Sequence, residues 1–143
     1  DVAILSKSKH PILRLIETAN RNSDAKAILL CKEIKDFKRY GVPTVKKLSN
    51  NLFAVKEVIE KPDKPKSNFG ILPLYYFRPE IFSSLKKIKQ GKGKEFQLTD
   101  GIQNLIKRNQ KVLAIILNEN EEEIDVGTVE SYKNSQEITF KKA

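Results

Sequence analysis

Apolar residues spaced three or four positions apart predict three amphipathic helices along the chain. The first begins at Pro11, the second has Pro79 in its first turn, and the third covers residues 98–110. In the third helix, Thr99 is the expected N-cap and Asp100 places a favourable charge in the first turn. The predicted apolar faces are Ile12, Leu15, Ile16 and Ala19; Ile81, Phe82, Leu85 and Ile88; and Ile102, Leu105 and Ile106.

Apolar runs between and after these helices predict strands. Residues 26–34, KAILLCKEI, and residues 111–117, KVLAIIL, are short and mainly apolar, which is typical of strands covered on both faces. Residues 42–48 and 52–60 are predicted to pair through the polar turn SNN, after an earlier turn at Gly41. Residues 69–77, FGILPLYYF, contain Pro73, which indicates an edge strand, a bulge or a distorted strand.

The last part of the chain combines an acidic segment with one more helix. Residues 118–123, NENEEE, indicate a solvated loop, and residues 124–138 indicate a short strand end that leads into a helix capped by Thr128. Helices and strands alternate throughout, which favours an α/β layer architecture with a mixed sheet. No repeat or linker divides the chain, so we expect a single domain over residues 1–143.

The composition indicates a folded protein without a membrane segment or a zinc site. Hydrophobic residues make up 39% of the chain and include seven Phe and four Tyr, enough for a core. No apolar run approaches the roughly 18 residues of a membrane span, and the first residues lack a signal-peptide core, so we expect a cytoplasmic protein. The chain has a single cysteine, Cys31, and a single histidine, His10. They can form neither an internal disulfide nor a four-ligand zinc site. We expect Cys31 to be an inert core thiol and His10 a helix-entry residue.

The net charge of +9 comes mostly from lysine and would attract polyanions. It also fits a lysine-rich thermophile surface or plain solubility. Because no RNA- or DNA-binding motif accompanies the charge, we do not expect nucleic acid as the partner. A nucleic-acid module, which stays an alternative, would bind oligonucleotides in a salt-sensitive way. The segment GKGK at 91–94 lacks the spacing of a phosphate-binding loop and indicates an ordinary loop.

Four charged positions at strand ends are candidates for chemistry. Glu60 and Lys61 precede Pro62, which ends the ladder of hydrogen bonds, so both side chains can turn into one cleft. There the carboxylate could bind sugar hydroxyls and the ammonium a phosphate, although a charged surface turn is the simpler interpretation of composition alone. Asp1 and Asp125 border strand-like runs and could share a magnesium ion with phosphate oxygens. The alternative is one frayed terminal acid and one helix-entry acid.

Taken together, RYGV, VIEKPDKPKSN, LYYF, EFQLTD and DVGTVESY resemble, in order and spacing, the sugar-1-phosphate nucleotidyltransferases. The chain looks like the glucose-1-phosphate uridylyl- and thymidylyltransferases from Asp1 to about Tyr132. The resemblance implies a Rossmann-like nucleotide-diphospho-sugar transferase sandwich, an α/β fold with a mixed sheet, of which this chain is the C-terminal part. It implies transfer of a nucleotidyl group from a nucleoside triphosphate, UTP or dTTP, to a sugar 1-phosphate such as glucose 1-phosphate, with release of pyrophosphate.

The resemblance also implies residue roles and partners. The implied substrate-binding residues are Gly41, Glu60, Lys61 and Tyr75, the implied Mg²⁺ ligands are Asp1 and Asp125, and the implied catalytic residues are Asp1 and Lys61. A phosphate oxygen of the sugar phosphate attacks the α-phosphorus in line, and Lys61 with the metal offsets the repulsion between the two anions. The full-length protein is expected to be a homo-oligomer.

Two features depart from the family pattern. The family's nucleotide-binding half lies N-terminal to the aspartate matched by Asp1, so we expect this chain to be part of a catalytic domain, inactive alone, with an exposed sheet edge. Pro73 stands where family members usually have glycine, which puts the pocket wall and the sugar in question. The alternative is a catalytically silent nucleotidyltransferase-like domain with a regulatory or scaffolding role.

Overall fold

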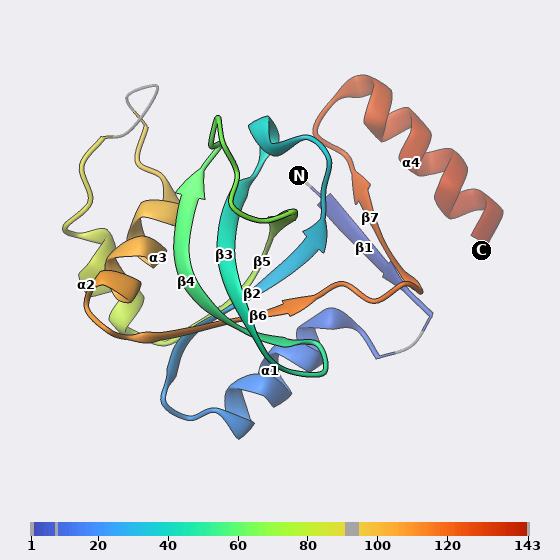
Figure 1. Ribbon diagram of the computed structural model, residues 1–143. Helices are drawn as coiled ribbons and strands as arrows, with labels where there is room; N and C mark the ends of the chain where they lie inside the picture. The colour runs from blue at the N-terminus through green and yellow to red at the C-terminus, as the bar shows by residue number, and fades with distance from the viewer. Residues whose placement is uncertain (1, 8, 91–94, 143) are drawn as a thin grey trace.

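The computed structural model describes residues 2–7, 9–90 and 95–142, and it contains a five-stranded mixed sheet with helices on both faces (Figure 1). The strand order is β3-β4-β6-β2-β5, in which only β2 and β6 are parallel neighbours. The strands of this sheet are β2 (Ala25–Glu33), β3 (Gly41–Ser49), β4 (Leu52–Glu60), β5 (Phe69–Phe77) and β6 (Lys111–Ile116). The mixed α/β architecture predicted from the sequence is therefore confirmed.

A second, two-stranded sheet lies beside the main one (Figure 1). It pairs β1 (Val2–Ser6) with β7 (Glu121–Asp125) in antiparallel fashion. The remaining elements are α1 (Pro11–Arg21), the short 3-10 helix η1 (Phe37–Arg39), α2 (Glu80–Leu85), α3 (Leu98–Lys107) and α4 (Val129–Lys142). None of the helices in the described ranges is long and apolar enough to cross a lipid bilayer.

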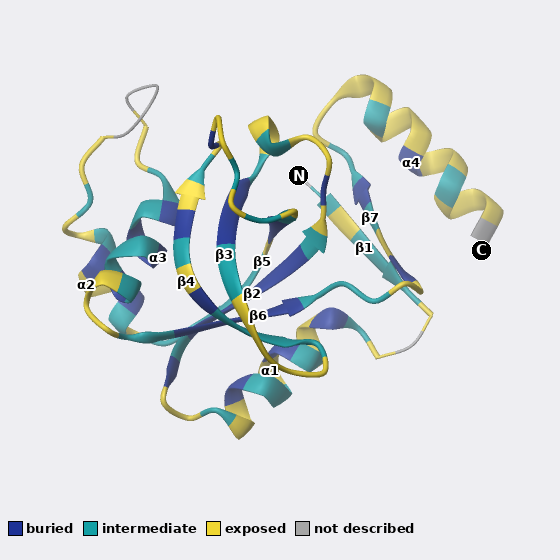
Figure 2. Cartoon of the chain, viewed as in Figure 1, coloured by how far each residue is buried: buried dark blue, intermediate teal, exposed yellow. Residues whose placement is uncertain are grey.

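The interior strand β2 is covered on both faces, as its continuous apolar run predicts (Figure 2). Alternate side chains point to opposite faces of a strand. Leu29 and Cys31 therefore pack with the helices α2 and α3, whereas Ile28 and Leu30 pack with α1. Cys31 is fully buried and free, and burial raises the pKa of its thiol, so the predicted inert core role fits the structure.

Pro73 lies where an edge strand bulges. β5 forms one edge of the main sheet, and its register against β2 shifts between the pairs Leu29 with Tyr75 and Cys31 with Ile71. The bulge leaves Pro73 outside the regular ladder, where its missing amide hydrogen costs no hydrogen bond. The predicted edge or bulge is confirmed.

The helix α1 begins as predicted, whereas α2 ends at Leu85, before the predicted face residue Ile88. His10 is the N-cap of α1 and accepts a hydrogen bond from the Ile12 amide, as expected for a helix-entry residue. However, Ile12 and Ile16 are exposed, as is Phe82 on α2, so these three assignments to a buried face are wrong. Each lies at the border of its apolar stripe, where the helix turns away from the sheet that covers its neighbours.

Two further expectations about local structure are corrected. Gly41 begins β3 rather than forming a turn. The N-cap of α3 is Gln97, and Thr99 lies inside the first turn with its side chain buried. By contrast, Thr128 caps α4 as predicted, because its Oγ1 accepts a hydrogen bond from the Ser131 amide at 3.0 Å.

The strand β7 begins inside the acidic segment 118–123, which was predicted as a solvated loop, and continues into the predicted strand end at residues 124–125. Its alternate residues, which share one face, each form an ion pair with a base from a different element. We call these three pairs the ion-pair ladder; they are Glu121 with Arg14, Glu123 with Lys32, and Asp125 with Arg39. The three acidic side chains are 0%, 6% and 35% exposed in that order, so the ladder runs from the interior to the surface. The ladder ties the small sheet to the rest of the molecule.

Candidate functional site

Four of the residues implied by the resemblance line one pocket of about 320 Å³: Gly41, Glu60, Tyr75 and Asp125. The pocket lies between the main sheet, the start of α3 and the strand β7. Lys61 is placed beside it, with Nζ 3.9 Å from Glu60 Oε1 and a half-exposed side chain. Asp1 lies outside the described residues, as does the segment 91–94. Val2, the residue that follows Asp1, lines the same pocket and pairs with Asp125 across the small sheet.

Glu60 is held in place from two sides. It is the last residue of β4 and pairs with Gly41 at the start of β3. Its Oε2 accepts a hydrogen bond from Thr99 Oγ1 at 3.0 Å, which leaves Oε1 facing Lys61. A Cβ atom on Gly41 would lie 2.5 Å from Thr99 Cγ2 and 3.1 Å from Glu60 Oε2. Glycine at this position therefore permits Thr99 to approach and orient the carboxylate.

The turn after β4 brings Lys61 to the same side as Glu60. Lys61 has a φ of 43°, in the left-handed region that residues with a side chain rarely adopt. Its amide still donates to the Tyr40 carbonyl at 3.0 Å, after which Pro62 cannot continue the ladder. The hypothesis that Pro62 ends the strand fits this geometry, and the left-handed backbone supplies the change of direction that the sequence did not indicate. Strained backbone of this kind is concentrated at functional sites.

Tyr75 forms an apolar wall of the pocket. Its ring stacks on Phe77 with centroids 5.2 Å apart, and its burial, with Glu60 nearby, raises the pKa of the phenol to about 12. The phenol is therefore neutral at physiological pH and can donate a hydrogen bond. Pro73 and Ile71 from the same strand complete this wall. Pro73 is thus in a position to affect which ligand fits.

Asp125 is engaged through both carboxylate oxygens. Oδ1 accepts from the Gly127 amide at 2.8 Å and Oδ2 from Arg39 Nη2 at 2.7 Å. These hydrogen bonds, that of Gly127 first, lower the pKa of the Asp125 carboxyl and keep it ionised. Arg39 was not singled out from the sequence. The signal available was its place in RYGV, directly before the Tyr40-Gly41 pair that faces the pocket.

Asp125 is the described residue that could bind a magnesium ion in the pocket. Among the described residues no three His, Cys, Asp or Glu side chains are grouped to hold a metal. Mg²⁺ usually keeps several waters and binds through one or two carboxylates together with substrate phosphates. One partly exposed, ionised carboxylate at a pocket wall fits that coordination.

Lys32 contacts both Tyr40 and the strand β7, which lie on two sides of the pocket. Its ammonium pairs with Glu123 and lies 5.2 Å from the centre of the Tyr40 ring. Burial lowers the pKa of Lys32, but the hydrogen bonds to Glu123 and Tyr40 outweigh it, so the net shift is upward and the charge is retained. The charge of Lys32 therefore contributes to the spacing of the pocket walls. Neither Lys32 nor Thr99 was predicted as a site residue.

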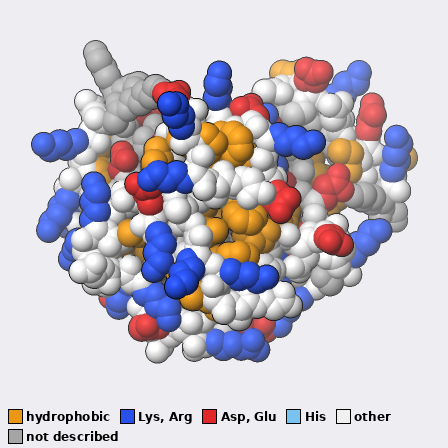
Figure 3. Space-filling model, viewed as in Figure 1, with side chains coloured by type: hydrophobic (Ala, Val, Ile, Leu, Met, Phe, Trp, Pro, Cys, Tyr) orange, Lys and Arg blue, Asp and Glu red, His pale blue; other side chains and the backbone are white. Residues whose placement is uncertain are grey.

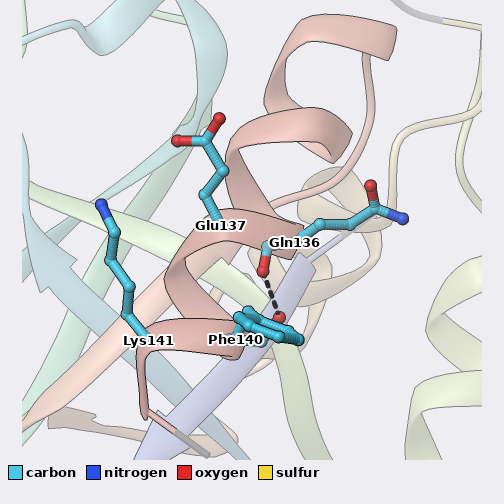
Figure 4. Close-up of a pocket in the computed structure, with 5 residues that line it drawn as sticks. Gln136, Glu137, Phe140 and Lys141 are labelled. Atoms are coloured by element: carbon cyan, nitrogen blue, oxygen red, sulfur yellow. Dashed lines mark hydrogen bonds between the residues drawn. The ribbon is translucent and has the colours of Figure 1, made fainter.

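A second cavity, of about 760 Å³, lies along α4 and has a different character (Figure 4). It is lined by Gln136, Glu137, Thr139, Phe140 and Lys141, all from one helix. The Phe140 side chain is 88% exposed, and Glu137 and Lys141 extend from the helix surface (Figure 4). Because its described lining comes from a single helix, this cavity lacks the converging polar groups of a binding site.

On the face that Figure 3 shows, the basic charge is not gathered into one patch. Lys and Arg side chains are spread over the visible face, with Asp and Glu side chains between them (Figure 3). A dispersed distribution of this kind favours solubility over recognition of one polyanion.

Comparisons with known proteins agree with these observations. A family model described as "Nucleotidyl transferase" matches residues 6–141. UTP--glucose-1-phosphate uridylyltransferase 1 of Staphylococcus saprophyticus is 33% identical over 106 residues, which are 71% of this chain and 36% of that protein. The low-salt glycan biosynthesis nucleotidyltransferase Agl11 of Haloferax volcanii is 28% identical over 98 residues, which are 68% of this chain and 26% of that protein.

The fold has a solved counterpart. A crystal structure of UDP-glucose pyrophosphorylase complexed with UDP-glucose is similar with a TM-score of 0.87 and 25% sequence identity, covering 99% of this chain and 54% of that one. The likeness confirms the expected nucleotide-diphospho-sugar transferase architecture. The chain matches 36% of the length of the Staphylococcus relative and 54% of the pyrophosphorylase structure.

Proposed function

The chain belongs to the nucleotidyl transferase family, and on this premise we propose that the whole protein transfers a nucleotidyl group from UTP or dTTP to glucose 1-phosphate and releases pyrophosphate. The observation that carries the proposal is the convergence of Glu60, Lys61 and Asp125 around one pocket. The printed names of the relatives, a UTP--glucose-1-phosphate uridylyltransferase and a UDP-glucose pyrophosphorylase, support the choice of substrates.

In this proposal the sugar lies against β4 and β5. Glu60, held by Thr99, accepts hydrogen bonds from sugar hydroxyls, and the Gly41 backbone allows the ring to approach. Tyr75 and Pro73 contact the apolar face of the sugar. The left-handed turn at Lys61 directs its ammonium toward the sugar phosphate. Each of these groups helps to orient the attacking phosphate oxygen. Orientation of the reactants is a main source of rate acceleration in a reaction between two anions.

In this proposal Asp125 would hold Mg²⁺, together with Asp1, which directly precedes the strand β1 that pairs with β7. When bound, the ion would offset the negative charge of the phosphates. Asp125 is suited to this role because its carboxyl is ionised and already oriented by the Gly127 amide. Lys61 supplies a second positive charge beside the pocket, near Glu60.

The test is a pyrophosphate-release assay on the whole protein expressed from its native coding sequence, with glucose 1-phosphate and either UTP or dTTP. We expect magnesium-dependent turnover that Asp125→Ala abolishes, and we expect Lys61→Ala to raise the KM for glucose 1-phosphate. Lys64→Ala, which removes the same charge from the exposed connector three residues later, is the matched control. Turnover that neither Asp125→Ala nor Lys61→Ala affects would contradict the site.

The second candidate is a catalytically silent domain with a regulatory or scaffolding role. The retained Glu60, Lys61 and Asp125 argue against loss of activity, since a silent domain has no need to keep three such groups around one pocket. Binding of glucose 1-phosphate without release of pyrophosphate, under all tested nucleotides, would favour this candidate.

A further inference from the structure

The pocket contains one base that the proposed reaction has not yet used. Arg39 ends the short 3-10 helix η1, lines the pocket, and has a side chain that is 62% exposed. Its ion-pair partner is Asp125, with Nη2 2.7 Å from Oδ2. This pair is the outermost of the ion-pair ladder and the only one of the three that borders the pocket through both partners.

The Arg39 pair engages an Asp125 oxygen that could also bind a metal ion. Gly127 already donates to Asp125 Oδ1, so Oδ2 is the oxygen that faces a charged side chain. A divalent cation at Oδ2 would bring a second positive charge to the same atom. Two positive charges bound to the same oxygen atom repel each other, so the cation and the Arg39 guanidinium compete for Asp125.

We propose that Arg39 is a substrate-binding residue that Asp125 holds in the ligand-free protein, and that it moves to a phosphate oxygen of the substrate when a divalent cation binds Asp125. This inference rests on the proposed function, because it takes Asp125 as the cation ligand. A guanidinium binds phosphate through two parallel hydrogen bonds, which suits it to the new partner better than a point charge.

The surroundings of Arg39 permit the exchange. Arg39 directly precedes Tyr40, whose carbonyl accepts the Lys61 amide at 3.0 Å, so the two bases border the same piece of backbone. A phosphate bound by Lys61 is therefore near the segment that carries Arg39. The inner pairs of the ladder, formed by Glu121 and Glu123, hold β7 when Arg39 leaves.

The first test measures binding of Mn²⁺, which prefers the same oxygen ligands as Mg²⁺, by the loss of its free electron paramagnetic resonance signal in the whole protein. Without substrate, Arg39→Gln should tighten Mn²⁺ binding about two- to fivefold, the size expected when an exposed ion pair is lost. Lys38→Gln removes the same charge one residue earlier, from a side chain that does not line the pocket, and should leave the affinity unchanged. Weaker Mn²⁺ binding by Arg39→Gln would overturn the proposal.

The second test measures glucose 1-phosphate binding by calorimetry in the presence of Mn²⁺. Arg39→Gln should weaken it about tenfold, as for a lost hydrogen bond between charged groups, and Arg39→Lys should restore part of the affinity. If wild type binds both ligands and Arg39→Gln matches it for both, the proposal is overturned while the proposed function stands. If wild type binds neither ligand, the proposed function fails and the inference fails with it.

Discussion

Thr99 acts on the pocket through a single hydroxyl group. Its Oγ1 donates to Glu60 at 3.0 Å while its methyl group packs against Gly41. Replacement by Val keeps the shape and removes the hydrogen bond. We expect Thr99→Val to weaken binding of glucose 1-phosphate by about tenfold, because Glu60 loses its orientation, and to change the free energy of unfolding by only about 1 kcal/mol.

Calorimetric titration together with chemical denaturation checks this prediction. Thr99→Ser keeps the hydroxyl and should bind glucose 1-phosphate nearly as well as wild type. Wild-type affinity in the Val variant together with a loss in the Ser variant would show that the methyl contact with Gly41, rather than the hydrogen bond to Glu60, decides the affinity.

Tyr75 should make the stability of the protein depend on pH in the alkaline range. Its pKa is raised from about 10 in the unfolded chain to about 12 by burial and by Glu60, so the folded state holds the proton more tightly. The stabilisation is therefore fully present below about pH 10 and is lost as the pH rises through about 12.

The comparison of wild type with Tyr75→Phe isolates this effect. The phenolate absorbance that differs between the two proteins should appear with a midpoint of about pH 12. The difference in unfolding free energy between them should shrink from about pH 10 upward. A midpoint near the usual value for tyrosine would mean that Tyr75 is exposed to solvent.

At the scale of elements, β7 depends on charged partners in addition to the one buried apolar side chain, Ile124. Glu121 has a fully buried side chain that pairs with Arg14 and accepts the Asn118 amide at 2.7 Å. Glu121→Gln keeps an oxygen for Asn118 but leaves the Arg14 charge largely buried without its partner. We expect a loss of about 3 kcal/mol in unfolding free energy, measured by denaturant titration.

A double replacement provides the control for this pair. Arg14 Nε and Glu121 Oε1 are buried without a hydrogen-bond partner among the described residues, so the pair is imperfectly satisfied. Arg14→Leu with Glu121→Leu should therefore cost less than Glu121→Gln alone, because no buried charge remains. A double variant that is as unstable as the sum of its two single variants would contradict this account.

The ion-pair ladder also explains which elements the sequence predicted and which it did not. Periodic apolar runs identified α1, α3 and the strands of the main sheet, because burial of apolar side chains dominates their stability. The strand β7 consists mainly of acids, and its partners Arg14 and Arg39 lie 107 and 86 positions away in the chain. Local pattern contains no information on such pairs, so the sequence alone predicts a loop at residues 118–123.

The residues of the candidate site likewise fall into two groups, those that sequence motifs predict and those that only tertiary contacts reveal. Glu60, Lys61 and Asp125 were identified because recognisable motifs contain them, and the pocket unites Glu60 and Asp125 with Lys61 beside it. Thr99 and Lys32 act through side-chain contacts between distant elements, Thr99 with Glu60 on β4 and Lys32 with Glu123 on β7. For Thr99, helix-capping statistics even favoured a different role, which the burial of its side chain against Gly41 overrides.

At the scale of the whole molecule, the described residues contain one pocket that combines Glu60, Tyr75 and Asp125. The chain covers 54% of the UDP-glucose pyrophosphorylase structure that it matches. The 13 described residues that line the pocket include Glu60 and Asp125, which we propose to bind the sugar and the metal ion. We therefore expect the 143-residue chain to bind glucose 1-phosphate in calorimetry and to release no pyrophosphate when UTP or dTTP is added.

The two measurements separate binding from turnover, because binding energy accelerates a reaction only when both reactants are held together. Glu60→Gln in the 143-residue chain should abolish the calorimetric signal, which shows that any binding occurs at this pocket. Pyrophosphate release by the wild-type chain that disappears in Asp125→Ala would contradict the prediction. The described pocket would then position both substrates by itself, and Arg39 and Lys61, its two cationic neighbours, would be the groups to test for triphosphate binding.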